Sequence, residues 1–150
     1  MGDRASTATR PVALPCACAN LRRAARAVTQ LYEEELRGTG LRATQFTLLQ
    51  ALGTTGTITQ GGLGELLLLD STTLTRTLRP LVGRGWVRSV PGLDRRERHF
   101  QLTAAGRREL DRARPRWELA QQRLRKVLGD TGWERLQADL LGVTEAIHSA

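Results

Sequence analysis

The chain has 150 residues, of which 40% are hydrophobic, so it is long enough for one compact domain and too apolar for a disordered tail. No apolar run approaches the roughly 20 residues that span a bilayer, and residues 1–15 do not resemble a signal peptide. The sequence therefore predicts a soluble, cytoplasmic protein. Its formal net charge of +8 favours a polyanionic partner, either nucleic acid or an anionic membrane surface.

The sequence lacks the short motifs of common enzyme sites. It has no glycine-rich phosphate loop, no H-E-x-x-H and no G-x-S-x-G. His99 and His148 lie far along the chain from Cys16 and Cys18, so a four-ligand zinc site within one chain is not expected. A cysteine nucleophile is the remaining enzymatic alternative, but no base stands near either cysteine in sequence. We therefore expect no enzyme, no bound metal and no cofactor.

The first half of the chain shows a flexible tail followed by helical spacing of apolar residues. Residues 1–15 contain two prolines and predict the tail. Asp70 or Ser71 supplies an N-cap, and Pro80 predicts either a bend inside the fourth helix or the local loss of one hydrogen bond. The predicted elements are helices over 16–37, 43–52, 60–68 and 71–84, with a very short strand at 57–59. The residues predicted to face inward from the third and fourth helices are Leu63, Leu66, Leu67, Leu74, Leu78, Leu81 and Val82.

The second half changes from helical to alternating periodicity and back. Alternation at 86–90 and again at 99–102, around a charged loop, predicts a β-hairpin with a basic tip. From Ala104 onward, apolar residues at spacings of three and four predict a long helix bent at Pro115, followed by a last helix from Thr131. These apolar seams predict dimer and core packing. The fold class is mainly α with a small β-hairpin (α+β).

The order of helices and hairpin is typical of a winged helix-turn-helix protein, and it marks candidate DNA contacts. Hydroxyls near a helix N-terminus can reach phosphates or base edges, and an arginine one turn further on can read guanine. In the hairpin loop, Asp94 can brace Arg96 for insertion into a narrow minor groove. The predicted DNA-binding residues are Ser71, Thr72, Thr73, Thr75, Arg76 and Arg79 on the helix, and Arg95, Arg96 and Arg98 in the hairpin.

Four segments of the sequence resemble those of a known family. The segments Leu69–Arg76, Gly85–Val87, Asp94–Arg96 and Leu102–Gly106 together resemble the DNA-binding lobe of the MarR (multiple antibiotic resistance regulator) family. The helix from residue 60 departs from the family pattern, because three glycines replace better helix formers. The resemblance implies a single MarR-like domain over 16–150, with dimerisation helices at 16–40 and 104–150 and a winged-helix lobe at 41–103.

The resemblance also implies a homodimer that places two recognition helices and two wings on a pseudo-palindromic operator. The leading hypothesis is a sequence-specific transcriptional regulator, a repressor, which a small-molecule effector or thiol oxidation releases from double-stranded DNA. The alternative is an architectural protein that coats DNA with little sequence preference.

Cys16 and Cys18 lie at the start of a predicted helix, where a thiolate is stabilised. Residues two apart on a helix point about 200° away from each other, so the two thiols are not expected to form a disulfide together. Three interpretations stay open: oxidant or electrophile sensing, thiolate metal binding shared between subunits, and two small, partly buried residues with no such role.

Overall fold

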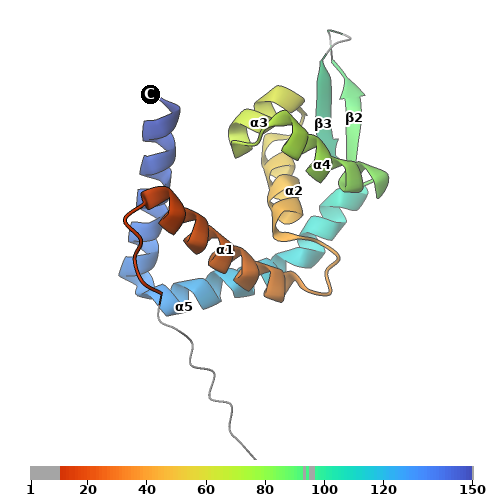
Figure 1. The fold of residues 1–150 in the computed structure, drawn as a ribbon. Coiled ribbons are helices and arrows are strands. Elements are labelled where there is room, and N and C mark those ends of the chain that lie inside the picture. Colours follow the sequence, from red (N-terminus) through yellow and green to blue (C-terminus); the bar gives the residue numbers. More distant parts are fainter. Residues whose placement is uncertain (1–10, 93, 95–96, 150) are drawn as a thin grey trace, which may run out of the picture.

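The hairpin and the helices predicted from periodicity are all present (Figure 1). The computed structural model describes residues 11–92, 94 and 97–149. Its mainly helical composition with a small antiparallel sheet confirms the predicted fold class. The elements in chain order are α1 (Ala17–Leu36), α2 (Ala43–Thr55), β1 (Ile58–Thr59), α3 (Gln60–Leu67), α4 (Ser71–Gly83), β2 (Val87–Pro91), β3 (Arg98–Leu102) and α5 (Ala104–His148).

The sheet is antiparallel and has the strand order β1-β3-β2. Strands β2 and β3 pair from Val87 opposite Leu102 to Pro91 opposite Arg98, so the connecting turn is shorter than the loop predicted from charge alone. The two-residue strand β1 joins the other side of β3, where Ile58 lies opposite Phe100. The sheet therefore anchors the hairpin to the start of α3 (Figure 1).

The core lies where α2, α4, the sheet and the first part of α5 meet. Leucines at helical spacing fill it, and burying each of them removes apolar surface from water. The Trp117 ring of α5 stacks on Phe46 of α2, with 5.6 Å between ring centroids. The buried residues of this cluster are Leu36, Leu41, Phe46, Leu48, Leu49, Leu52, Leu63, Leu74, Leu78, Leu81, Val87, Phe100, Leu110 and Ala113.

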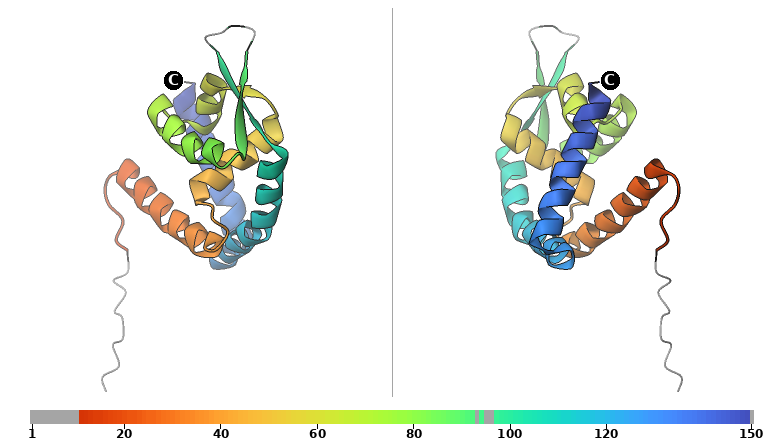
Figure 2. Two further views of the ribbon diagram at one scale, coloured as in Figure 1. Left: turned by 90° about the vertical axis from the view of Figure 1, so that its right-hand side faces the viewer. Right: turned by 90° about the vertical axis from the view of Figure 1, so that its left-hand side faces the viewer.

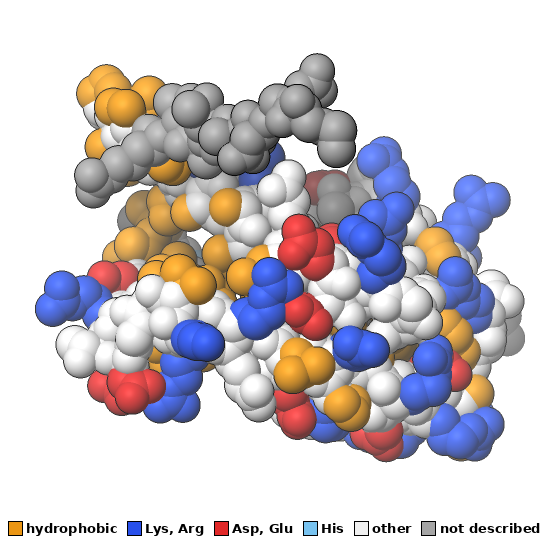
Figure 3. Space-filling model, turned by 90° about the horizontal axis from the view of Figure 1, so that it is seen from below, with side chains coloured by type: hydrophobic (Ala, Val, Ile, Leu, Met, Phe, Trp, Pro, Cys, Tyr) orange, Lys and Arg blue, Asp and Glu red, His pale blue; other side chains and the backbone are white. Residues whose placement is uncertain are grey.

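The terminal helices extend away from this core. α1 packs along α5, and α5 is broken at Gly129, whose backbone has φ 72° and ψ 164° (Figures 1 and 2). The last part of α5 after this break corresponds to the separate last helix predicted from residue 131. Seen from below, hydrophobic side chains gather over the terminal helices (Figure 3). The large apolar residues that these two helices leave exposed are Leu21, Leu119, Val127, Leu128, Leu140, Leu141, Val143 and Ile147.

Two residues that were predicted to face inward are exposed in the structure, so these predictions are wrong. Leu66 of α3 is 53% exposed and Val82 of α4 is 40% exposed. α3 has only eight residues and packs through one narrow face, so Leu63 and Leu67 use the available interior and Leu66 faces outward. Val82 lies at the edge of α4, beside a hollow that separates this helix from the hairpin.

Pro80 and Pro115 both lie inside helices that continue past them.

Within the described residues, no helix is both long enough and apolar enough to cross a membrane.

Candidate nucleic-acid interface

The turn between α3 and α4 uses a left-handed residue that is not glycine. Leu68 has φ 50° and ψ 42°, a conformation that a leucine adopts at some cost in strain. The next amide, that of Leu69, donates to the carbonyl of Gly64 at 2.9 Å and closes the turn. A Cβ on Gly64 would lie 3.1 Å from the Leu69 carbonyl oxygen, so a glycine suits this close approach. The turn directs α4 across the outside of the lobe.

Asp70 is the N-cap residue of α4. The sequence had left either Asp70 or Ser71 as the cap. Its carboxylate accepts the Thr73 amide at 2.8 Å and the Thr73 hydroxyl at 2.6 Å. These hydrogen bonds from Thr73 lower the pKa of Asp70 below its ordinary value. The hydroxyl proton of Thr73 is thus directed back to the cap, which leaves this side chain an acceptor for any outside partner.

The outward face of α4 carries the predicted contact residues together. With Leu74, Leu78 and Leu81 buried, the opposite side of the helix is solvent-exposed. A shallow hollow of about 400 Å³ lies on it. The residues that line this hollow are Ser71, Thr72, Thr75, Arg76 and Arg79. We call this surface the α4 face.

The hairpin forms a second wall beside the α4 face. A hollow of about 270 Å³ separates them, and Arg79 of α4 and Arg98 of β3 both line it. Arg95 and Arg96 lie outside the described residues. Asp94 is exposed, and its carbonyl accepts the amide of Glu97 at 3.0 Å. Its predicted role as a brace for Arg96 stays a prediction.

Some arginines elsewhere in the described residues are paired with acids, whereas those of the α4 face have no ion pair there. Arg123 of α5 binds Glu35 of α1 at 2.6 Å, and Arg112 binds Glu109 within α5. Among the ion pairs between described residues, none involves Arg76, Arg79 or Arg98. Their positive charge is therefore available to an external anion, and it lies between a helix N-terminus and the hairpin.

A hydrogen bond links the start of α3 to the α4 face, and sequence reasoning missed it. The Gln60 side-chain amide donates from Nε2 to the Thr75 hydroxyl at 3.1 Å. The two residues are fifteen positions apart on different helices. No periodicity within one helix could have paired them, because the contact depends on how α3 packs on α4.

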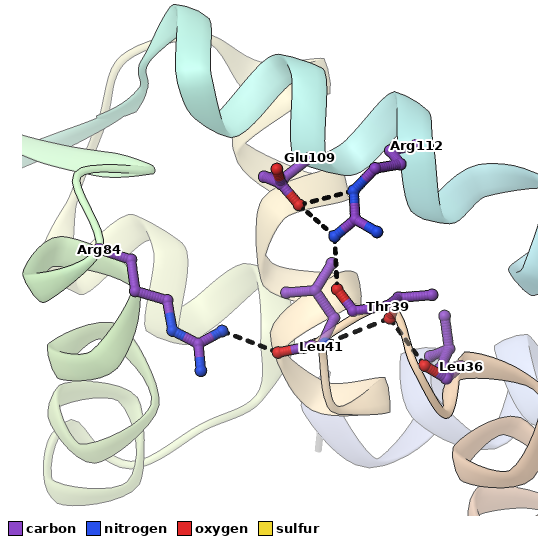
Figure 4. A network of polar contacts seen from close by, with 7 residues as sticks. Leu36, Thr39, Leu41, Arg84, Glu109 and Arg112 are labelled. Atoms are coloured by element: carbon purple, nitrogen blue, oxygen red, sulfur yellow. Dashed lines mark hydrogen bonds and ion pairs between the residues drawn. The ribbon is translucent and has the colours of Figure 1, made fainter.

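A second polar network connects α4 to the terminal helices (Figure 4). The Arg84 guanidinium donates to the Gly40 carbonyl at 2.7 Å, in the loop between α1 and α2. From α5, Arg112 donates to the carbonyl of the adjacent Thr39 at 2.6 Å. Thr39 is buried, and its hydroxyl donates to the Leu36 carbonyl at 2.7 Å, at the end of α1. The loop after α1 is thus held from both α4 and α5.

The two cysteines lie at the N-terminus of α1 and are exposed free thiols. Cys16 is the N-cap residue, and its side chain makes no capping hydrogen bond. Exposure contradicts the interpretation of them as partly buried residues in the isolated chain. Within the described part of the chain, no cluster of three or more metal-binding side chains occurs.

The short strand, the two helices of the turn and the paired strands beside α4 define a winged helix-turn-helix protein. The sequence profile of the MarR family matches residues 41–97, which run from α2 into the hairpin loop. YwoH of Bacillus subtilis (strain 168), described as an uncharacterised HTH-type transcriptional regulator, is 34% identical over 83 residues. That match covers 55% of this chain and 61% of the length of YwoH.

Solved structures extend the likeness to nearly the whole chain. The M. tuberculosis transcriptional regulator MosR, in complex with DNA, superposes with a TM-score of 0.80 at 35% identity, covering 89% of this chain and 97% of that one. A mutant of E. coli MarR complexed with operator DNA gives a TM-score of 0.76 at 26% identity, covering 84% and 91%. The chain belongs to the MarR family, as its resemblance predicted.

Proposed function

We propose that this chain is a transcriptional regulator that binds double-stranded DNA through the α4 face and the wing, which is the hairpin of β2 and β3. The observation that carries the proposal is the gathering of unpaired arginines and short hydroxyls on one exposed face, at a helix N-terminus and beside a hairpin. α4 enters the major groove, where Arg76 contacts a guanine or a phosphate. Arg98, together with Arg95 and Arg96, contacts the backbone or the minor groove. The similarity of this chain to MosR and MarR, each solved with DNA, supports DNA binding.

The active form in this proposal is a homodimer built through α1 and α5. Exposed leucines, valines and an isoleucine on these helices would bury apolar surface against a second copy. Two-fold symmetry then presents two α4 faces to two half-sites about 34–36 Å apart, one helical turn along the same side of DNA. The operator is accordingly pseudo-palindromic.

The output in this proposal is repression, relieved by a small molecule or by oxidation of Cys16 or Cys18. The network from Arg84 through Gly40 and Thr39 to Arg112 supports such control, because it joins the end of α4 to both terminal helices (Figure 4). A signal that shifts α1 or α5 would move the α4 face of one protomer relative to the α4 face of the other. The dimer would then no longer contact both half-sites at once.

The experiment that tests the proposal is fluorescence anisotropy with DNA from the gene's own upstream region, against a scrambled duplex, at near-physiological salt. We expect a preference of about a hundredfold or more, which corresponds to about 2.7 kcal/mol. Affinity should also fall steeply with salt, because arginine–phosphate contacts release counterions. Arg76→Ala should reduce both the preference and the salt slope.

Equal affinity for both duplexes would favour the alternative, an architectural protein that coats DNA. To separate this from an operator located elsewhere, the wild-type protein can be offered a pool of random duplexes. Enrichment of one palindromic sequence supports the regulator, whereas no enrichment supports the architectural function.

A further inference from the structure

Three alternate threonines of α4 use their hydroxyls in different ways. Thr73 donates to the Asp70 carboxylate, and Thr77 donates to the Thr73 carbonyl at 3.0 Å. Thr75, between them, accepts a hydrogen bond from the Gln60 amide at 3.1 Å. Among the hydrogen bonds of the described residues, none takes up the hydroxyl proton of Thr75. That proton is therefore left for a partner outside the chain.

Gln60 is held in place by the corner between the sheet and α3. Thr59, the residue before it, pairs with His99 in the sheet and also caps α3, accepting the Gly62 amide at 3.0 Å. The Gln60 side chain thus extends from a fixed point towards α4. Gln60 and Thr75 both line the hollow between α4 and the wing, so the pair lies between the two proposed DNA contacts.

A hydroxyl has one proton to donate and two lone pairs that accept. Because the Gln60 amide occupies one lone pair of Thr75, the hydroxyl proton is directed away from Gln60 and into solvent. Donation into the oxygen also polarises the hydroxyl and makes it a stronger donor. The acceptors that DNA offers to such a donor are phosphate oxygens and the N7, O6 or O4 atoms of the major-groove edge.

We infer that Gln60 is a positioning residue that makes Thr75 a hydrogen-bond donor to an acceptor atom of DNA. Gln60 acts through the Thr75 hydroxyl and needs no contact with DNA of its own. The inference rests on the proposed function, since it concerns how the α4 face recognises DNA. It assigns to α3 a part in recognition that the periodicity of α4 does not reveal.

A double-mutant cycle tests this inference directly. The variants are Gln60→Ala, Thr75→Val and the two combined, and the probe is a duplex that the wild-type protein selects from a random pool. We expect each single substitution to weaken binding about three- to tenfold, the range that one net hydrogen bond supplies. The double variant should bind no more weakly than Thr75→Val alone, because Gln60 has no effect without the hydroxyl.

Thr72→Val is the matched control, because Thr72 lies on the same face but has no hydrogen bond to Gln60 among the described residues. Its effect should simply add to that of Gln60→Ala. Thr75→Ser keeps the hydroxyl and should keep the coupling. Thermal unfolding of every variant, without DNA, shows whether a loss of affinity arises from unfolding.

Modified DNA identifies the acceptor. Methylphosphonate linkages remove a charged phosphate oxygen, and 7-deazapurines or other bases that lack a major-groove acceptor remove a base atom. At one position, one of these substitutions should abolish the effect of Thr75→Val. If no position in the scan does so, the inference is wrong.

The cycle also separates failure of the inference from failure of the proposed function. If Gln60→Ala costs the same with and without the Thr75 hydroxyl, Gln60 acts through α3 or by its own contact, and only the inference is overturned. If the wild-type protein selects no duplex and prefers none to a scrambled one, the proposed recognition fails, and the inference is overturned with it.

Discussion

Arg84, directly after α4, donates a hydrogen bond of 2.7 Å to the carbonyl oxygen of Gly40, in the loop that follows α1. Its guanidinium also lies 4.8 Å from the centre of the Trp86 ring, within the range of a cation–π interaction. One arginine thus joins the end of the proposed recognition helix to the start of the wing and to the terminal helices. It differs in this respect from Arg79, five residues earlier on the α4 face.

Arg84→Ala should lower stability, and Arg79→Ala should lower DNA affinity. Losing the Gly40 hydrogen bond and the contact with Trp86 should cost about 1 kcal/mol, measured by urea unfolding, since Arg84 is exposed and solvent screens part of the interaction. Arg79 has no ion pair among the described residues, so its loss should leave the urea midpoint nearly unchanged. A stable Arg84→Ala protein would show that this link contributes nothing to the fold.

The cap of α4 makes stability depend on Asp70. Asp70→Ala should lower the thermal midpoint by roughly 3 to 6 °C at neutral pH, because the Thr73 amide and hydroxyl lose their acceptor. The pKa of Asp70 is lowered in the folded state, so its contribution is complete above the ordinary aspartate value of 3.8 and is lost as pH falls through the lower, folded value.

The difference in midpoint between wild type and Asp70→Ala should accordingly stay constant from neutral pH to about pH 5 and shrink below about pH 4. Thr73→Val is the control, because the Thr73 hydroxyl is the largest cause of the lowered pKa. This variant should show a smaller pH dependence. A difference that grows as pH falls would contradict the assigned sign.

Two glycine substitutions should have opposite effects. Gly61 lies in α3 with nothing within 4 Å of an added Cβ, so Gly61→Ala should stabilise the protein by up to about 1 kcal/mol. Gly106, near the start of α5, is buried, and a Cβ there would overlap the Trp86 carbonyl. Gly106→Ala should destabilise the protein by several kcal/mol, of the order of an overpacked core.

Urea unfolding of both glycine variants measures these effects on one scale. Equal effects at the two positions would refute the close approach between Gly106 and Trp86. The Gly61→Ala variant also tests whether release of DNA requires a flexible α3. If this variant is more stable than the wild-type protein and still releases DNA as the wild-type protein does, release does not require a glycine at this position.

Exposed thiols at Cys16 and Cys18 make the oxidation hypothesis testable. If oxidation of either cysteine releases DNA, peroxide should dissociate the wild-type complex, and serine at both positions should abolish the response. Single substitutions then identify the reactive thiol, and non-reducing electrophoresis detects a bridge between subunits. Release by peroxide that persists in the double serine variant would exclude both cysteines as the sensor.

The sequence by itself determined the faces of α4 and the positions of the two hairpin strands. Once Leu74, Leu78 and Leu81 are buried at helical spacing, the geometry of 3.6 residues per turn places Thr72, Thr75 and Arg76 outside. Alternation located the strands as well, but it did not sort the faces of β2, where Arg88 and Ser89 are both exposed. Such local patterns follow from covalent geometry and the burial of apolar surface, so they are readable before any tertiary contact is known.

Only the tertiary structure decided how separate elements meet. The hydrogen bonds from Gln60 to Thr75 and from Arg84 to Gly40 join residues 15 and 44 positions apart, which no local pattern relates. The exposure of Leu66 likewise depends on how narrow a face α3 presents to its neighbours. Packing between elements also decides which arginines are neutralised, because an acid on a neighbouring helix pairs with Arg123 and none in the described residues pairs with Arg76.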